Sequence, residues 1–164
     1  MKNNKGFSLV ELIIVIAIMA ILVGVMAPQL IKYIEKSNVS SDTQLCDSVR
    51  TALTTAMMDP AVINASDYTS PSGSAVALGS VLSAGGSTFQ AAVLDTLGAN
   101  AVTDVTDQLK STMHSGTKAN NITVDIINDN NVIVYVKDGC GNGQKGSCTG
   151  CDGLYAGATK PASP

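Results

Sequence analysis

The sequence predicts an α+β fold in which one long N-terminal helix packs on a small antiparallel β-sheet head. Three observations lead to this prediction. An apolar run opens the chain, a helical stripe of apolar residues follows it, and two β-branched segments flank a turn in the C-terminal part. The 164 residues suffice for one small domain and one membrane helix, but not for two domains with separate cores.

The apolar run covers residues 7–31 and contains one charged residue, Glu11. A helix of this length spans roughly 37 Å, which exceeds the ~30 Å hydrocarbon core of a bilayer. Lys2 and Lys5 precede the run and predict a cytoplasmic N-terminus. We therefore expect residues 7–31 to form a transmembrane and assembly helix, and residues 32–164 to form an extracytoplasmic head.

Two ordinary explanations of this run are a secretory signal peptide and a plain single-pass anchor. A signal peptide has an apolar region of about 7–15 residues, which is shorter than this one. A plain anchor explains the apolar character but not the position of Glu11, because a carboxylate inside an apolar helix is costly and is commonly functional.

A cut between Gly6 and Phe7 would give Glu11 a partner. The new α-amino group of Phe7 would lie at the positive end of the helix dipole, four residues before Glu11 on the same face. Glu11 could then pair with its own amine or with the amine of a neighbouring chain. Pairing with a neighbour would set the axial register of a helical bundle, since a slipped neighbour leaves a charge unpaired.

The residues Lys5-Gly6-Phe7-Ser8-Leu9-Val10-Glu11, followed by sixteen residues without charge or Pro, resemble the N-terminal signature of type IV pilins and type II secretion pseudopilins. The resemblance implies that residues 1–6 are a leader, which a prepilin peptidase removes after Gly6. It also implies that this enzyme methylates the Phe7 amine, that Glu11 pairs with a neighbouring subunit's N-terminus, and that an inner-membrane platform assembles the filament.

Gly24 and Pro28 interrupt the helical pattern of the membrane segment. Pro28 lacks an N–H, its ring clashes with the carbonyl of Gly24, and Gly24 is itself a poor helix former. The resemblance also favours a helix-breaking Pro at this place. We expect residues 20–28 to kink, or to melt in the assembled filament; a mild kink without a role is the alternative.

The helix is predicted to continue to Met58 as an amphipathic segment, and Asp59-Pro60 is its expected end. Polar residues, among them Asp42, occupy the intervening positions. The apolar stripe has helical spacing and consists of Leu45, Val49, Ala52, Leu53 and Ala56.

The middle of the chain predicts a loop at residues 70–73, a short helix at residues 75–82 and a longer helix at residues 88–97. For the longer helix, Ser87 and Gln90 match a capping box, and Gly98 suits the C-terminal cap. Residues 102–113 are compatible with a helix or an extended run.

Two segments rich in β-branched residues, 122–127 and 132–136, flank a polar turn and predict a hairpin. Ile122, Val124 and Ile126 would form one face of the first strand, with Thr123, Asp125 and Ile127 on the other. Only these two strands are predicted, whereas many relatives of the resembled family have four, so the subclass stays open.

The four cysteines are Cys46 on the long helix and Cys140, Cys148 and Cys151 in a glycine-rich tail. An even number in an extracytoplasmic head favours disulfides, with one bridge inside the tail and one to Cys46 as the preferred pairing. A zinc site of four thiolates and free thiols are the alternatives. Calcium binding by Asp138, Asn142 and Asp152 is less favoured than their being solvated loop residues.

No catalytic constellation is recognisable in the sequence. Its one histidine, His114, lies in a Ser/Gly-rich stretch, and the chain has no nucleotide-binding loop and no His pair with metal-ligand spacing. Without Lys2 and Lys5, 8 Lys+Arg would face 13 Asp+Glu, which argues against nucleic acid as a partner. We expect no enzymatic activity, no cofactor and no bound metal.

The sequence thus predicts a structural subunit that assembles with copies of itself into an extracellular filament for adhesion, motility or surface contact. Before assembly it would be a single-pass protein of the cytoplasmic membrane. A pseudopilin of a type II secretion system or a minor pilin is the alternative within the resembled family. A membrane-tethered binding module is the alternative outside it.

Overall fold

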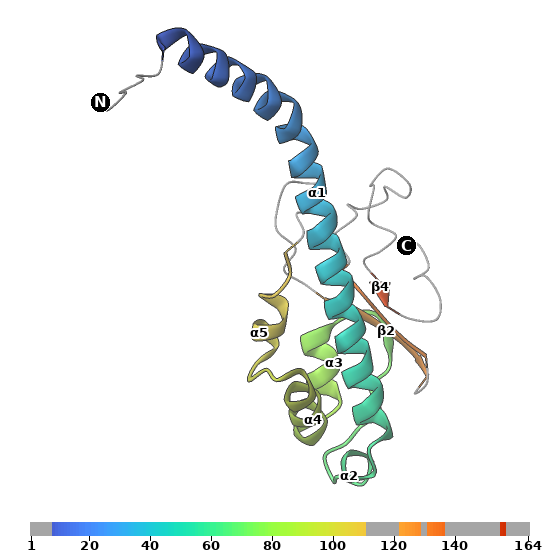
Figure 1. Ribbon diagram of the computed structural model, residues 1–164. Helices are drawn as coiled ribbons and strands as arrows, with labels where there is room; N and C mark the ends of the chain where they lie inside the picture. The colour runs from blue at the N-terminus through green and yellow to red at the C-terminus, as the bar shows by residue number, and fades with distance from the viewer. Residues whose placement is uncertain (1–7, 111–121, 129–130, 137–154, 157–164) are drawn as a thin grey trace, which may run out of the picture. The chain divides into compact units, whose positions relative to one another are not determined.

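The computed structural model describes residues 8–110, 122–128, 131–136 and 155–156 (Figure 1). The chain divides into two compact units, Met1–Glu35 and Lys36–Pro164, which are described separately. The elements in chain order are α1 (Leu9–Met58), α2 (Pro60–Ile63), β1 (Gly73–Ala77), α3 (Leu78–Ala84), α4 (Ser87–Leu97), α5 (Val102–Thr106), β2 (Thr123–Asn128), β3 (Asn131–Tyr135) and β4 (Tyr155–Ala156).

The first unit contains the N-terminal half of α1. Its stretch Leu9–Ile34 is long and apolar enough to cross a membrane, and none of it is buried inside the protein. The helix continues through Gly24 and Pro28 without a break. The predicted long helix is thereby confirmed, and melting of residues 20–28 in a filament stays a prediction.

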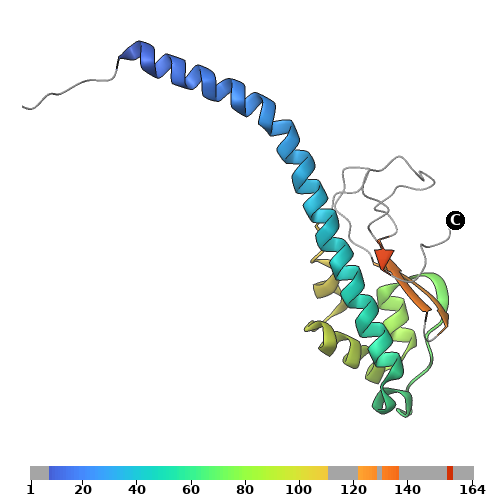
Figure 2. The same ribbon diagram turned by 45° about the vertical axis from the view of Figure 1, so that its right-hand side comes forward.

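The second unit is built around the C-terminal half of α1. Figures 1 and 2 show the strands on one side of this half and the helices α4 and α5 on the other. Leu45 is half-buried, and the rest of the predicted apolar stripe is buried. The main core residues come from α1, α3, α4, β2 and β3 and include Cys46, Val49, Leu53, Leu82, Phe89, Val93, Val124 and Val134.

Asp42 was predicted to lie on the polar side of this helix, and this prediction was wrong because its carboxylate is fully buried. Its Oδ1 accepts the backbone N–H of Lys110 at 2.8 Å. A buried carboxylate is tolerated when hydrogen bonds replace the lost water. The segment that follows α5 supplies such a bond, and this contact cannot be read from helical periodicity.

The sheet is antiparallel with the strand order β1-β2-β3-β4. The hairpin prediction is confirmed, since Val124 pairs with Val134 and Ile126 with Val132. The prediction of only two strands was wrong. β1 and β4 were missed because β1 is a short run of small residues and β4 has two residues.

The predicted helix at residues 75–82 was partly wrong, because its beginning belongs to β1. Val76 pairs with Val124 and Ala77 with Thr123, and α3 begins only at Leu78. A short apolar run fits a strand and a helix equally well until its partner is known. Further along, residues 102–106 form α5, and the rest of the undecided segment lies partly outside the described residues.

α4 occupies the predicted position, and Gly98 ends it in the left-handed conformation with φ of 64°. The predicted role of Ser87 as the N-cap was wrong, because Ser87 is already helical and Gly86 occupies the cap position. The acceptor at this helix end comes from Asp67, whose Oδ2 accepts the N–H of Thr88 at 3.0 Å.

Most of β2 is buried on both faces, which differs from a sheet with one solvated face, although Ile127 near its end is 63% exposed. Val124 and Ile126 contribute to the core, as predicted, but Thr123 and Asp125 on the opposite face are also shielded. Asp125 Oδ1 accepts hydrogen bonds from the hydroxyls of Ser74 at 3.2 Å and Tyr135 at 3.3 Å. These bonds connect β1, β2 and β3 on that face.

Candidate functional site

The first turn of α1 contains the one carboxylate of the apolar segment. Glu11 Oε2 accepts the backbone N–H of Ser8 at 2.9 Å, and the carbonyl of Ser8 accepts the N–H of Leu12 at 3.3 Å. Ser8 is therefore the N-cap residue, and the carboxylate satisfies an N–H that has no partner within the helix. Gly6 and Phe7, between which cleavage is predicted, lie outside the described residues.

Beyond this turn the helix presents apolar side chains on all sides. Within the described first unit, residues such as Ile13, Ile16, Leu22 and Met26 are at least half exposed, at 51%, 56%, 56% and 66%. A helix that is hydrophobic all round requires lipid or other protein around it. A side chain added at Gly24 would meet nothing within 4 Å in the isolated subunit. Any constraint on Gly24 would therefore come from neighbouring molecules.

Comparison with known protein families identifies the motif in this segment. The model of the prokaryotic N-terminal methylation motif matches residues 1–27, the part that contains Gly6, Phe7, Glu11 and Gly24. Over residues 1–27, the chain carries the N-terminal motif of the type IV pilin family. The predicted family is thereby confirmed.

Two curated pilin relatives illustrate the extent of the similarity. The type IV major fimbrial protein FimA of Dichelobacter nodosus is 43% identical over 56 residues, which cover 34% of this chain and 36% of FimA. A fimbrial protein of Moraxella nonliquefaciens is 42% identical over 55 residues, which cover 34% of this chain and 36% of the relative. The similarity thus spans just over a third of either relative. No solved structure matches the chain.

Among the described residues of the head, Cys46 has no disulfide partner, and its side chain is fully buried in the core. Burial raises the pKa of this thiol to about 12, with additional contributions from the carboxylates of Asp42 and Asp47. A buried thiol with a raised pKa is a poor nucleophile and a poor metal ligand. Its predicted partners Cys140, Cys148 and Cys151 lie outside the described residues, so the disulfide pairing stays a prediction.

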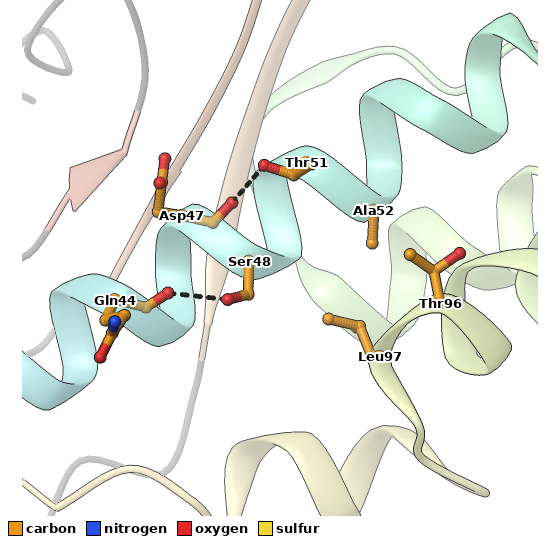
Figure 3. Close-up of a pocket in the computed structure, with 7 residues that line it drawn as sticks. All are labelled: Gln44, Asp47, Ser48, Thr51, Ala52, Thr96 and Leu97. Carbon is orange, nitrogen blue, oxygen red and sulfur yellow. Dashed lines mark hydrogen bonds between the residues drawn. The ribbon is translucent and has the colours of Figure 1, made fainter.

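The head also has a shallow groove between α1 and α4, lined by Gln44, Asp47, Ser48, Thr51, Ala52, Thr96 and Leu97 (Figure 3). Its hydroxyl groups are already engaged within their own helices. Ser48 donates to the carbonyl of Gln44 at 3.0 Å, and Thr51 donates to that of Asp47 at 2.9 Å. The groove therefore offers few groups that could bind a ligand.

Potential metal ligands do not converge anywhere in the described part of the chain, where no group of three or more His, Cys, Asp or Glu side chains is suitably placed. The calcium candidates Asp138, Asn142 and Asp152 lie outside that part. Tyr135 has its pKa raised to about 12, first by burial and then by the nearby Asp125 carboxylate. This shift reflects packing in the sheet.

The capping contact of Ser8 was missed by the sequence analysis, although a signal for it was present. Ser8-Leu9-Val10-Glu11 has the Ser-x-x-Glu pattern of a capping box directly before an apolar run. The prediction gave Glu11 one role, in pairing with an amine. The structure gives its carboxylate a second role within the same chain.

Proposed function

We propose that this protein is the structural subunit of a type IV pilus or a related filament. The observation that carries this proposal is the exposed apolar helix Leu9–Ile34, with Glu11 in its first turn, next to the methylation motif. Such a surface is satisfied either by lipid or by the same helices of neighbouring copies. The two relatives are named as fimbrial proteins, which favours a pilus over a secretion pseudopilin.

The precursor would be a single-pass protein of the cytoplasmic membrane with its N-terminus, including Lys2 and Lys5, in the cytoplasm. A prepilin peptidase would remove residues 1–6 and methylate Phe7. An assembly platform in the same membrane would then transfer the helix from lipid into the growing filament. We assign residues 7–31 to the membrane and assembly helix, residues 32–164 to the head, and no enzymatic role to the protein.

Glu11 would set the register of the filament by pairing with the methylated amine of a neighbouring subunit. The low dielectric of a helical bundle strengthens this attraction and penalises a charge without a partner. Gly24 and Pro28 would allow the helix to adjust its backbone within the bundle. Glu11, Gly24 and Pro28 would thus each have a physical role in the filament.

Mass spectrometry of the N-terminal peptide tests the proposal, using membrane and sheared-surface fractions of the native host. We expect a peptide that begins at methylated Phe7 in the sheared fraction. The variant Gly6→Val is the control, because a bulky residue before the cut should leave the leader in place. A chain that begins at Met1 and stays in the membrane fraction would instead support a membrane-tethered binding module.

A further inference from the structure

We propose that the backbone N–H of Ser8 positions the Glu11 carboxylate for assembly by fixing its orientation before a neighbouring subunit arrives. The inference rests on the proposed filament function and adds a positioning group to it. Its basis is the 2.9 Å hydrogen bond from Ser8 N to Glu11 Oε2, in a helix whose first internal bond runs from Leu12 N to Ser8 O.

The cap and the intersubunit pair are compatible because a carboxylate has two oxygens. Ionised Glu accepts hydrogen bonds at about four lone-pair positions. With Oε2 on Ser8, Oε1 remains available to the ammonium group of a neighbouring chain. Ser8 and Glu11 would thus act together, and the carboxylate would not have to leave one partner to reach the other.

The apolar surroundings give this local bond its importance. A backbone N–H at the start of a helix has no intrahelical partner, and leaving it unsatisfied near hydrocarbon is unfavourable. A hydrogen bond to an ionised acceptor is stronger than one between neutral groups, and a negative charge is favoured at a helix N-terminus. The bond therefore stabilises Glu11 in the membrane and removes rotamer freedom that assembly would otherwise have to restrict.

Amide hydrogen exchange tests the cap on the intact precursor in detergent micelles. Glu11→Gln keeps an oxygen that can accept from Ser8, whereas Glu11→Ala removes it. We expect the Ser8 amide to exchange slowly in the wild type and in Glu11→Gln. In Glu11→Ala it should exchange about fivefold faster, the ratio that corresponds to a typical cap of about 1 kcal/mol. Equal rates in all three proteins would overturn the proposal.

Assembly tests the positioning role through the donor instead of the acceptor. Ser8→Ala keeps the backbone N–H, whereas Ser8→Pro removes it and leaves Glu11 in place. Filaments are counted per subunit that mass spectrometry shows to be cut and methylated. We expect Ser8→Ala to assemble normally and Ser8→Pro to lose filaments. Equal yields would overturn the positioning role. If a Ser8 variant is not cut, the Ser8 amide-exchange rates of the wild-type and Glu11-variant precursors decide whether the proposal stands.

The failure of this inference is distinguishable from failure of the proposed function. Glu11→Gln should keep the slow exchange of Ser8 and still lose filaments, because it lacks the charge. Normal assembly of Glu11→Ala would remove the charge-pairing role of Glu11, whatever the exchange rates are. Fast exchange at Ser8 in a wild-type protein that does form filaments would remove only the cap.

Discussion

The side chain of Asp67 caps helix α4 from outside the helix, with its Oδ2 accepting the backbone N–H of Thr88 at 3.0 Å. The hydroxyls of Ser87 and Thr88 add two bonds to the same carboxylate, at 2.6 and 2.8 Å. This arrangement ties the loop before β1 to the beginning of α4. It does so with one exposed carboxylate, which makes the contact accessible to mutation and to pH.

Replacing Asp67 with Ala should destabilise the head, because the Thr88 N–H and two hydroxyls lose their acceptor. We expect a lower midpoint of thermal unfolding for the full-length protein in detergent, followed by tyrosine near-ultraviolet circular dichroism. Asp95→Ala is the matched control, since it removes the same charge from an exposed residue of α4 whose carboxylate caps neither end of the helix. Equal shifts in the two variants would contradict the capping role.

The stability that Asp67 contributes should also depend on pH. The Ser87 hydroxyl, the Thr88 N–H and the Thr88 hydroxyl, in this order, hold the pKa of Asp67 well below its ordinary value of 3.8. A carboxyl whose pKa is lower in the folded than in the unfolded protein stabilises the fold above the unfolded pKa. That stabilisation is lost as the pH falls toward the folded pKa.

The free energy of unfolding of the wild type should therefore exceed that of Asp67→Asn by a constant amount at pH 5–7. This difference should shrink below about pH 4. Denaturant unfolding of both proteins at several pH values measures this difference. A difference that grows toward acid pH would exclude the proposed linkage.

Gly86 should not tolerate a side chain, although it lies at the surface end of α4. Its φ is 95°, and a Cβ at this place would overlap the backbone carbonyl oxygen of Asp67. We expect Gly86→Ala to lower the free energy of unfolding by at least about 1 kcal/mol. Gly79→Ala is the control, because its added Cβ makes an ordinary contact with Val102 at 3.8 Å. That variant should be neutral or stabilising.

The buried carboxylate of Asp42 should be necessary for stability, in contrast to its exposed neighbour Asp47. Asp42→Ala leaves the Lys110 N–H without its 2.8 Å acceptor, and we expect a loss of about 2 kcal/mol in the free energy of unfolding. Asp42→Asn keeps an acceptor oxygen and should lose less. Asp47→Ala should change stability by less than about 0.5 kcal/mol, and an equal loss there would argue against a specific role of Asp42.

Cys46 should resist alkylation in the folded protein, because its thiol is buried and its pKa is raised to about 12. We expect the peptide that contains Cys46 to stay unreactive toward iodoacetamide at pH 8 in the folded protein. A peptide that reacts after unfolding in denaturant alone would show that Cys46 is a free thiol. The variant Cys46→Ala gives the background of this measurement. A peptide that reacts only after reduction would show that Cys46 is in a disulfide with the tail.

The parts of the fold that local sequence determines were predictable. The long apolar run identified the first half of α1, and helical periodicity identified the second. A terminal glycine identified the end of α4, and β-branched residues around a polar turn identified the β2–β3 hairpin. Each of these signals lies within the element that it describes. For the candidate site, the order of Gly6, Phe7 and Glu11 along the chain predicts the processing and pairing roles, and these roles remain predictions because Gly6 and Phe7 lie outside the described residues.

The features that were missed depend on partners distant in sequence. Val76 and Ala77 are extended because they pair with β2, and nothing in their own neighbourhood requires a strand. Asp42 is buried because Lys110 supplies its backbone N–H, and α4 is capped by Asp67 from across a loop. Periodicity and propensity carry no information about such contacts.

The pairing of β1 with β2 has a consequence for the moment at which the head can fold. If the head crosses a membrane with its N-terminal part first, β1 emerges well before β2, because the helices α3 to α5 lie between them in the chain. Until Val124 and Ile126 have followed, the apolar stripe of α1 lacks the sheet that covers it. With the topology proposed above, export would therefore be almost complete before the core closes, and the emerging chain would be most exposed to aggregation and proteolysis during that interval.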